Sequence, residues 1–406
     1  MSTPVLGHMS VDDFLANYWQ KKAVVIRQGF ANFVSPISPD ELAGLTTQEG
    51  VLSRLILEQG GDYPWQMKSG PLKDSDYEGL SDHHWTILVQ EVDRHVPAVC
   101  DLFDRFNFLP SWRKDDVMVS FATRDSGVGA HIDSYDVFLL QGSGKRKWEI
   151  GEAIVGSAPA DGGLRAAAKQ TNQPGKSGPR YIEGLDVRIL AEVEATESFV
   201  LEPGDMLYLP PGVPHNGVAL EPCLTFSFGF LAPSQADMLS DFADWRQQER
   251  GPVRYSDLGA DKVLNSGLID SADIERVRDL VHSQSETEED LVKWFGCFIT
   301  RPQRGPVDCE EFDGTLDEFL ADFLDCQTWR RHEGLRIAGW TNGQALLFAD
   351  GENIPHQLTS SQLEKLTGQR ELTYDSLAGQ DDFLELLFKF TCRGWGYFAG
   401  EETENE

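Results

Sequence analysis

The spacing of apolar residues changes along the 406-residue chain, and its clearest pattern lies between residues 116 and 230. Short apolar runs there alternate with polar residues and are separated by glycine and proline turns, which is typical of β-strands. We expect strands over 117–122, 131–140, 145–150, 198–200 and 225–230. Several short strands with this spacing favour a sandwich or a barrel.

The first hundred residues mix helical and strand patterns. Ser10 and Ser38 are candidate N-caps, because each comes just before acidic residues and an apolar periodic run, and Pro39 suits the first turn of a helix. Residues 22–27 predict a strand, and the apolar spacing over about 85–106 predicts one long amphipathic helix.

After Pro233 the pattern becomes helical. Apolar residues at helical spacing predict helices over 235–250, 271–282, 287–300, 316–325, 360–366 and 381–391. A hairpin is expected between 336–340 and 345–348, and helices around a small hairpin suggest a winged-helix-like unit. We therefore expect an α+β multi-domain protein with a β-rich domain and N-terminal helices over 1–233, a helical region over 234–303 and a winged-helix-like domain over 304–406.

The chain carries 66 acidic and 35 basic residues, a formal net charge of −31. This excess argues against general affinity for a nucleic-acid backbone, so we expect no DNA binding by the C-terminal unit. It is compatible with a strongly basic protein partner, and equally with an acidic surface that serves solubility. The loop expected over 155–184 is basic instead. We interpret it as a solvated insertion, with a contact to RNA or to an anionic partner as the alternative.

None of the six cysteines forms a C-x-x-C pair, so neither a zinc knuckle nor a redox motif is indicated. The sequence shows no basic-then-apolar signal, and no apolar run approaches the roughly 18 residues that a membrane span needs. We therefore expect reduced thiols in a cytoplasmic protein without a membrane partner.

His131 and Asp133 are two residues apart in a predicted strand, so their side chains project from the same face. A His-x-Asp string alone is weak, since about one is expected by chance in a chain of this composition. His215 strengthens it, because three prolines just before it fix a non-helical path into the same β region. Two histidines and one carboxylate on one side of a metal suit non-haem Fe(II) oxygenases. The alternative is an ordinary histidine at a strand end.

Arg146 falls on the apolar face of the strand predicted over 145–150, because the other charged residues of this strand occupy the opposite face. An inward guanidinium without an anion is costly. The anion could be an internal carboxylate or a dicarboxylic co-substrate, which the planar fork of arginine fits well. Ser120 and Thr225, on neighbouring predicted strands, would add hydroxyl hydrogen bonds.

The run from Gly127 to Trp148, which reads GVGAHIDSYDVFLLQGSGKRKW, closely resembles bacterial JmjC-type ribosomal oxygenases. The run PPGVPH over 210–215 matches their second metal segment, and YWQKK over 18–22 is also similar. The likeness extends over nearly the whole chain. It is specific, because the metal ligands, the co-substrate arginine and the residues between them match together.

The resemblance implies a double-stranded β-helix of the cupin and JmjC type. It also implies that Fe(II), 2-oxoglutarate and O₂ are used to hydroxylate an arginine side chain of large-ribosomal-subunit protein sixteen. The three metal-ligand candidates would hold iron, and Arg146 would bind the far carboxylate of 2-oxoglutarate with help from Ser120 and Thr225. The helical region over 234–303 would form a homodimer.

Asp125, just before the glycine-rich run, is a candidate to attract the cationic substrate. Two departures from the family pattern matter. Ala130 stands where a proline is expected, which should only loosen the path into the strand, and the basic loop before Gly184 is longer than usual, which bears on the outer substrate contacts. Two other classes stay open: a cupin metalloenzyme that does not use 2-oxoglutarate and would not need Arg146, and a non-catalytic ribosome-binding module.

Overall fold

The computed structural model describes residues 5–58, 65–153, 181–182, 189–191, 193–256, 269, 271–282, 286–302 and 310–400. The chain divides into two compact units, Met1–Ala232 and Pro233–Glu406, and each has a hydrophobic core of its own. The basic loop expected over 155–184 lies almost entirely outside the described residues. None of the helices in the described ranges is long and apolar enough to cross a membrane.

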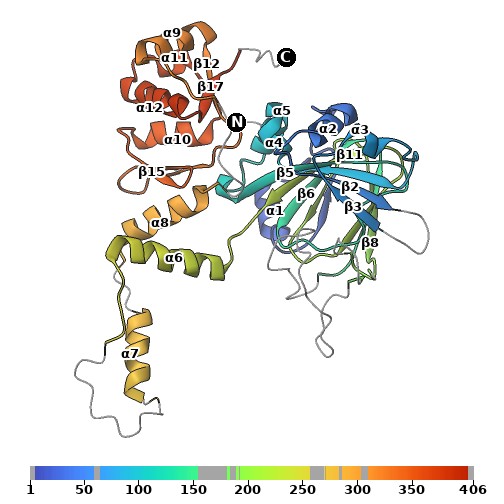
Figure 1. Cartoon of the computed structure of the whole chain (residues 1–406), viewed down its shortest axis with the longest axis horizontal. Helices are drawn as coiled ribbons and strands as arrows, with labels where there is room; N and C mark the ends of the chain where they lie inside the picture. The colour runs from blue at the N-terminus through green and yellow to red at the C-terminus, as the bar shows by residue number, and fades with distance from the viewer. Residues whose placement is uncertain are drawn as a thin grey trace. The chain divides into compact units, whose positions relative to one another are not determined.

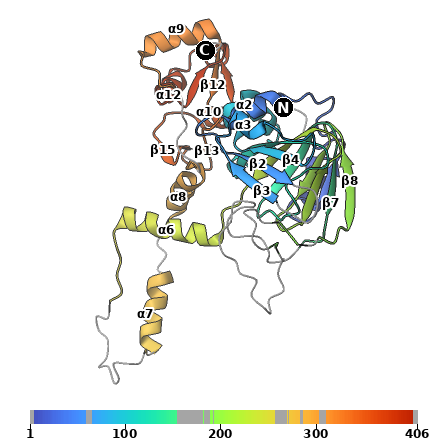
Figure 2. The same cartoon turned by 45° about the vertical axis from the view of Figure 1, so that its right-hand side comes forward.

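The first unit is built on two antiparallel sheets (Figure 1). The larger sheet has the strand order β1-β9-β6-β11-β5-β4-β2-β3, and the smaller has the order β10-β7-β8. The strands are β1 Val24–Ile26, β2 Ser53–Glu58, β3 Trp65–Ser69, β4 Trp85–Val89, β5 Lys114–Ala122, β6 Asp136–Ser143, β7 Arg146–Ile150, β8 Glu197–Leu201, β9 Met206–Leu209, β10 His215–Ala219 and β11 Cys223–Phe230. Figure 2 shows β7 and β8 side by side, and their register pairs Ile150 with Glu197.

Strand β6 is buried on both faces because the larger sheet has a core on each side. Val137 and Leu139 pack between the two sheets, in a cluster that includes Trp148 of β7. Phe138 and Leu140 pack instead into an aromatic core with the helices of this unit. Opposite faces of one strand thus serve two cores, as the alternation of a β-strand dictates.

The helices of the first unit begin where the sequence places caps. The Ser10 hydroxyl accepts a hydrogen bond from the backbone N–H of Asp13 at 3.1 Å, and Ser38 forms a capping box with Glu41 behind Pro39. Both predicted helix starts are confirmed. The helical segments are α1 Val11–Asn17, α2 Pro39–Thr46, α3 Asp74–Tyr77, α4 Val92–His95, α5 Pro97–Asp104 and a 3₁₀ turn over Ser111–Arg113.

The long helix predicted over 85–106 is wrong. Trp85–Val89 is strand β4, which lies between β2 and β5 and is buried along most of its length, and two short helices follow it. A short apolar run rich in β-branched and aromatic residues fits a buried strand as well as a helix, so its periodicity misled the prediction. Pro97 begins α5 and separates it from α4.

The second unit confirms the predicted helices and hairpin closely. Its helices are α6 Gln235–Arg250, α7 Ser271–His282, α8 Glu288–Thr300, α9 Leu316–Cys326, α10 Ser360–Gly368, α11 Tyr374–Leu377 and α12 Asp381–Cys392. Its strands are β12 Thr328–Arg331, β13 Ile337–Trp340, β14 Leu346–Ala349, β15 Glu352–Ile354, β16 Glu371–Thr373 and β17 Gly396–Phe398. They form two three-stranded sheets, β16-β12-β17 and β13-β14-β15.

Helix α8 packs directly on the second of these sheets. A Cβ at Gly296 would lie 2.3 Å from the ring of Phe348 in β14, so the helix approaches this strand through a residue without a side chain. The Thr300 hydroxyl accepts a hydrogen bond from the backbone N–H of Gly351 at 3.2 Å. Helix α7 differs, since its apolar residues Ile274, Val277 and Val281 are 48%, 43% and 65% exposed.

Candidate metal centre

His131 and His215 face each other across the point where the two sheets meet. The backbone N–H of each donates to the carbonyl of the other at 3.0 Å. These two bonds form an isolated antiparallel bridge at His215, the first residue of β10. The strand predicted over 131–140 begins later, as β6, at Asp136. Asp133 lies between this bridge and β6, and its carbonyl accepts from the N–H of Gly212 at 2.9 Å. Backbone hydrogen bonds therefore hold both ligand segments together.

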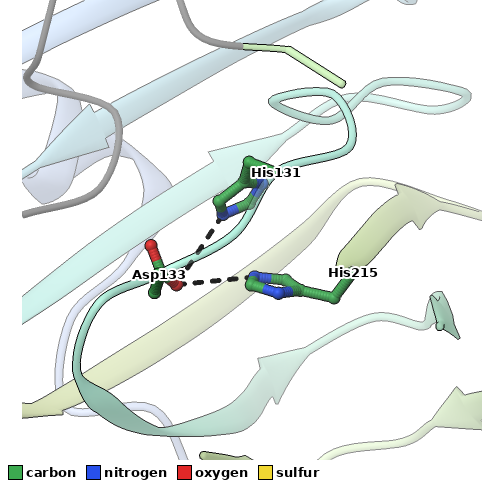
Figure 3. A group of neighbouring side chains, drawn as sticks. All are labelled: His131, Asp133 and His215. Atoms are coloured by element: carbon green, nitrogen blue, oxygen red, sulfur yellow. Dashed lines mark ion pairs between the residues drawn. The ribbon is translucent and has the colours of Figure 1, made fainter. Parts of the chain in front are cut away.

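The three predicted ligands converge on one point (Figure 3). The Oδ2 atom of Asp133 lies 3.5 Å from Nε2 of His215 and 3.9 Å from Nε2 of His131. One donor atom from each residue falls within 4.8 Å of the other two, and all three residues are buried. In the described part of the chain this is the single group of three or more such side chains with that geometry.

Both imidazoles are oriented by their own backbone. The Nδ1 atom of His131 lies 2.9 Å from the carbonyl oxygen of Gly129, and that of His215 lies 3.0 Å from the carbonyl oxygen of Val213. A proton on each Nδ1 satisfies these contacts and leaves each Nε2 with a free lone pair directed toward Asp133. Burial, with the neighbouring His131, lowers the pKa of His215 to about 4, so this ring is neutral at pH 7 and competent to bind a metal.

Arg146 lies on the inward face of β7, as the alternation predicts, and is 3% exposed. Its guanidinium donates to Thr225 Oγ1 at 3.1 Å and to Ser120 Oγ at 3.3 Å, and its Cζ lies 5.1 Å from the ring of Trp148. Among the described residues it forms no ion pair, and its Nε has no hydrogen-bond partner. Burial lowers the pKa of Arg146, which shows the cost of this position without an anion.

Trp148 and Gly217 belong to the same site, and no local sequence pattern predicts that they are partners. They are paired across β7 and β10, and a Cβ at Gly217 would lie 2.7 Å from the indole ring. The ring fills the space between Arg146 and His215, whose ring centroid is 5.9 Å away. Only the strand register reveals that Gly217 makes room for this indole.

Asp125 does not join the metal-ligand group. It has a φ of +61°, its side chain is 59% exposed, and its carboxylate lies 3.9 Å from Nδ1 of His83. A second carboxylate, that of Glu58, is close enough for the charge of Asp125 to raise its pKa, although burial is the larger cause. Glu58 was not predicted from the sequence, because its position at the end of β2 depends on strand pairing.

Ala130, which replaces the expected proline, is contacted by Leu190, which follows the loop expected over 155–184. Its carbonyl accepts from the backbone N–H of Leu190 at 2.8 Å, and Ile189 packs where a Cβ on Gly129 would fall. The segment before His131 is therefore fixed by a neighbouring chain segment.

Comparisons with known proteins agree with this site. The model of the JmjC domain matches residues 101–238. The chain is 34% identical over 396 residues to the ribosomal protein uL16 3-hydroxylase of Escherichia coli K12, which covers 96% of this chain and 97% of that protein. It is 35% identical over 419 residues to a probable ribosomal oxygenase of Haemophilus influenzae Rd, which covers 96% of each.

Solved structures match over the same extent. The structure of the E. coli ribosomal oxygenase YcfD in complex with cobalt and 2-oxoglutarate has a TM-score of 0.80 and 33% identity, and the match covers 97% of this chain and 99% of that one. Fold and site define an α+β protein with a cupin-type JmjC domain. More closely, the chain belongs to the bacterial JmjC ribosomal oxygenases and is a homologue of the uL16 3-hydroxylase.

Proposed function

We propose that this protein is an Fe(II)- and 2-oxoglutarate-dependent hydroxylase of ribosomal protein uL16, acting on an arginine side chain. The observation that carries the proposal is the buried His131, Asp133 and His215 group beside the unpaired guanidinium of Arg146. This donor set fits a divalent metal, because two imidazoles and one carboxylate offer three ligand atoms from one side. The E. coli relatives support the substrate and the co-substrate.

The three ligand side chains would hold the iron, each through one defined atom. His131 and His215 would bind iron through Nε2 and Asp133 through Oδ2, while the Nδ1 contacts hold both rings in place. The chemistry that iron would supply is coupled oxidation, in which 2-oxoglutarate becomes succinate and CO₂ and one oxygen atom of O₂ enters a substrate C–H bond. The three ligands are at most 8% exposed, which limits their contact with bulk water.

Arg146 would bind the remote carboxylate of 2-oxoglutarate. Its guanidinium is preorganised by the hydroxyls of Ser120 and Thr225, so co-substrate binding needs no reordering of this long side chain. The anion would also relieve the cost of the buried charge. A metalloenzyme that does not use 2-oxoglutarate gives no reason for a cation at this position.

The strong negative charge of the chain supports a basic partner such as a ribosomal protein. Asp125 is exposed near the glycine-rich segment that leads to His131, and we assign it the attraction of the substrate guanidinium. An enzyme that modifies a ribosomal protein would work in the cytoplasm. The same acidity disfavours DNA as a partner.

We further propose that 1–233 is the catalytic domain, 234–303 a helical dimerisation region and 304–406 a winged-helix-like domain. The exposed apolar face of α7 supports a homodimer, because a lone helix rarely leaves such a stripe to water. The small hairpin sheet with helices around it supports the winged-helix assignment.

The test is succinate formation by the purified protein with Fe(II), 2-oxoglutarate and O₂, with and without a uL16 peptide that carries the arginine. Succinate stimulated by the peptide, a gain of one oxygen atom on the arginine and silence in His131→Ala would support the proposal. Succinate without peptide modification would keep the oxygenase and discard the substrate. Absence of both succinate and peptide modification from iron-loaded protein would favour the binding module, and peptide modification that Arg146→Ala retains in full without succinate formation would favour a metalloenzyme that does not use 2-oxoglutarate.

A further inference from the structure

One buried carboxylate, that of Asp136, gathers side chains from three other segments of the first unit. Asp136 is 1% exposed and lies just after the ligand Asp133 in the sequence. Its Oδ1 accepts from the Tyr208 hydroxyl at 2.6 Å, and its Oδ2 accepts from Arg113 Nη2 at 3.0 Å and from Gln20 Nε2 at 3.2 Å. We call these four residues, Gln20, Arg113, Asp136 and Tyr208, the Asp136 cluster.

The cluster accounts for the YWQKK motif, which the metal site does not use. The Tyr208 hydroxyl, which donates to Asp136, also accepts a hydrogen bond from the backbone N–H of Gln20 at 2.7 Å. The ring of Trp19 stacks on that of Tyr208 at 5.7 Å, and the guanidinium of Arg113 lies 5.5 Å from the same indole. The motif that follows α1 therefore ends against the strands that lead to the metal ligands.

Register shows which strands the cluster joins. Asp136 is the first residue of β6, which follows Asp133, and Tyr208 lies in β9, which leads through the proline-rich turn to His215. Tyr208 pairs with Phe138, so the side-chain hydrogen bond joins the two strands at the end nearest the ligands. On the ligand side, the bond from Gly212 N–H to the Asp133 carbonyl joins the same two segments.

We propose that the Asp136 cluster is a brace that sets the positions of Asp133 and His215 before a metal binds. The inference rests on the proposed metal site and adds four positioning residues to it. If the ends of β6 and β9 could shift, metal binding would have to order the ligands, and the free-energy cost of this ordering would lower the affinity for the metal. Removal of groups that orient metal ligands typically lowers metal affinity about 10–100-fold, and the brace acts one step further out, so we expect about tenfold.

The chain offers a matched control at the opposite end of β9. Asp205 is 4% exposed, and its carboxylate accepts four hydrogen bonds, three of them from the N-terminal segment. The donors are Arg27 Nη1 at 2.7 Å, the N–H of Gln28 at 2.9 Å, Nε2 of Gln28 at 3.4 Å and the N–H of Glu202 at 3.2 Å. It directly precedes Met206, whose partner Leu140 is far along β6 from Asp133. Loss of this carboxylate should destabilise the fold without moving the ligands.

The experiment titrates Co(II) into full-length apo protein and follows the visible absorption of the bound ion, which needs no turnover. The variants are Asp136→Asn, Tyr208→Phe and the control Asp205→Asn, each measured where near-ultraviolet circular dichroism shows a folded protein. We expect Co(II) to dissociate about tenfold more readily from the first two variants and with wild-type affinity from the control. Arg113→Lys, which keeps the charge beside Asp136, should recover part of the loss relative to Arg113→Met.

The outcomes separate this inference from the proposed function. Wild-type protein that binds no Co(II), or binds it equally well as His131→Ala, would overturn the metal site itself. Wild-type binding with unchanged affinity in Asp136→Asn and Tyr208→Phe would overturn the brace alone. The brace would also be overturned if Asp136→Asn, Tyr208→Phe and Asp205→Asn all lost Co(II) affinity in proportion to their loss of unfolding free energy. General destabilisation would then explain the effect.

Discussion

Replacement of Arg146 by methionine separates the two explanations of its buried guanidinium. Among the described residues Arg146 forms no ion pair and bonds only two hydroxyls and, at 3.5 Å, the carbonyl of Gly217. Exchange of buried charged groups for apolar ones of similar volume is often neutral or stabilising by about 1–4 kcal/mol. We therefore expect Arg146→Met without co-substrate to have an unfolding free energy equal to or above that of the wild type.

The same substitution should remove co-substrate binding. Loss of one partner of a buried charge pair costs about 2–5 kcal/mol, and 2 kcal/mol corresponds to about thirtyfold in affinity. At about 100 times its wild-type Kd, 2-oxoglutarate should stabilise the wild type by about 2.7 kcal/mol, and a thirtyfold or greater loss of affinity should reduce this gain to about 0.9 kcal/mol or less in Arg146→Met. Urea unfolding with Co(II) present, with and without 2-oxoglutarate, measures both effects.

Lys147→Met on the solvent face of the same strand is the control and should alter neither quantity. A co-substrate role for Arg146 is refuted if Arg146→Met loses about 2 kcal/mol or more of unfolding free energy without ligand and still gains the full stabilisation from 2-oxoglutarate. Such a protein would use the guanidinium for an internal contact.

Three further predictions concern pH, packing and assembly. Burial, with the charge of a neighbouring aspartate, raises the pKa of Asp93 to about 7. The folded protein therefore keeps a proton that the unfolded chain releases near pH 3.8. The free energy of unfolding should fall by up to roughly 4 kcal/mol as the pH rises from 4 to 7. Asp93→Asn should flatten this part of the urea-derived profile, and an unchanged slope would contradict the assignment. Gly217→Ala places a Cβ 2.7 Å from the Trp148 ring and should lower the free energy of unfolding in urea by about 1–3 kcal/mol. The control Gly44→Ala, whose Cβ meets nothing within 4 Å, should raise it by about 0.5–1 kcal/mol. Equal effects of the two substitutions would show that the Trp148 ring moves aside without cost. Val277→Asp in α7 should convert a dimer to a monomer in sedimentation velocity with Co(II) affinity unchanged, and a dimer that persists would exclude this face.

The sequence predicted local features well where one residue's neighbours decide its environment. Alternation along 145–150 placed Arg146 inward, and the burial of β7 confirms it. Apolar spacing predicted α6 and α7 with the bounds that the structure gives them. Ligand identities followed from spacing and resemblance, and the structure brings the three side chains together.

Other features depend on register between strands, which no local pattern specifies. Gly217 serves the site only because it lies opposite Trp148, and Asp136 matters because Gln20, Arg113 and Tyr208 reach it from distant segments. Residues 85–89 form a strand because they pair with β2 on one side and β5 on the other. Tertiary context decided each of these cases.

The pairing of β7 with β8 gives the chain freedom to vary in length between them. Ile150 and Glu197 are direct partners, so the two ends of the intervening segment meet whatever lies between. Lengthening a loop whose ends are already joined costs only about 0.6 kcal/mol per doubling. Evolution can therefore enlarge or recharge this segment to suit different partners while the ligand-bearing strands stay in place, and a protein engineer can insert a reporter module there on the same grounds.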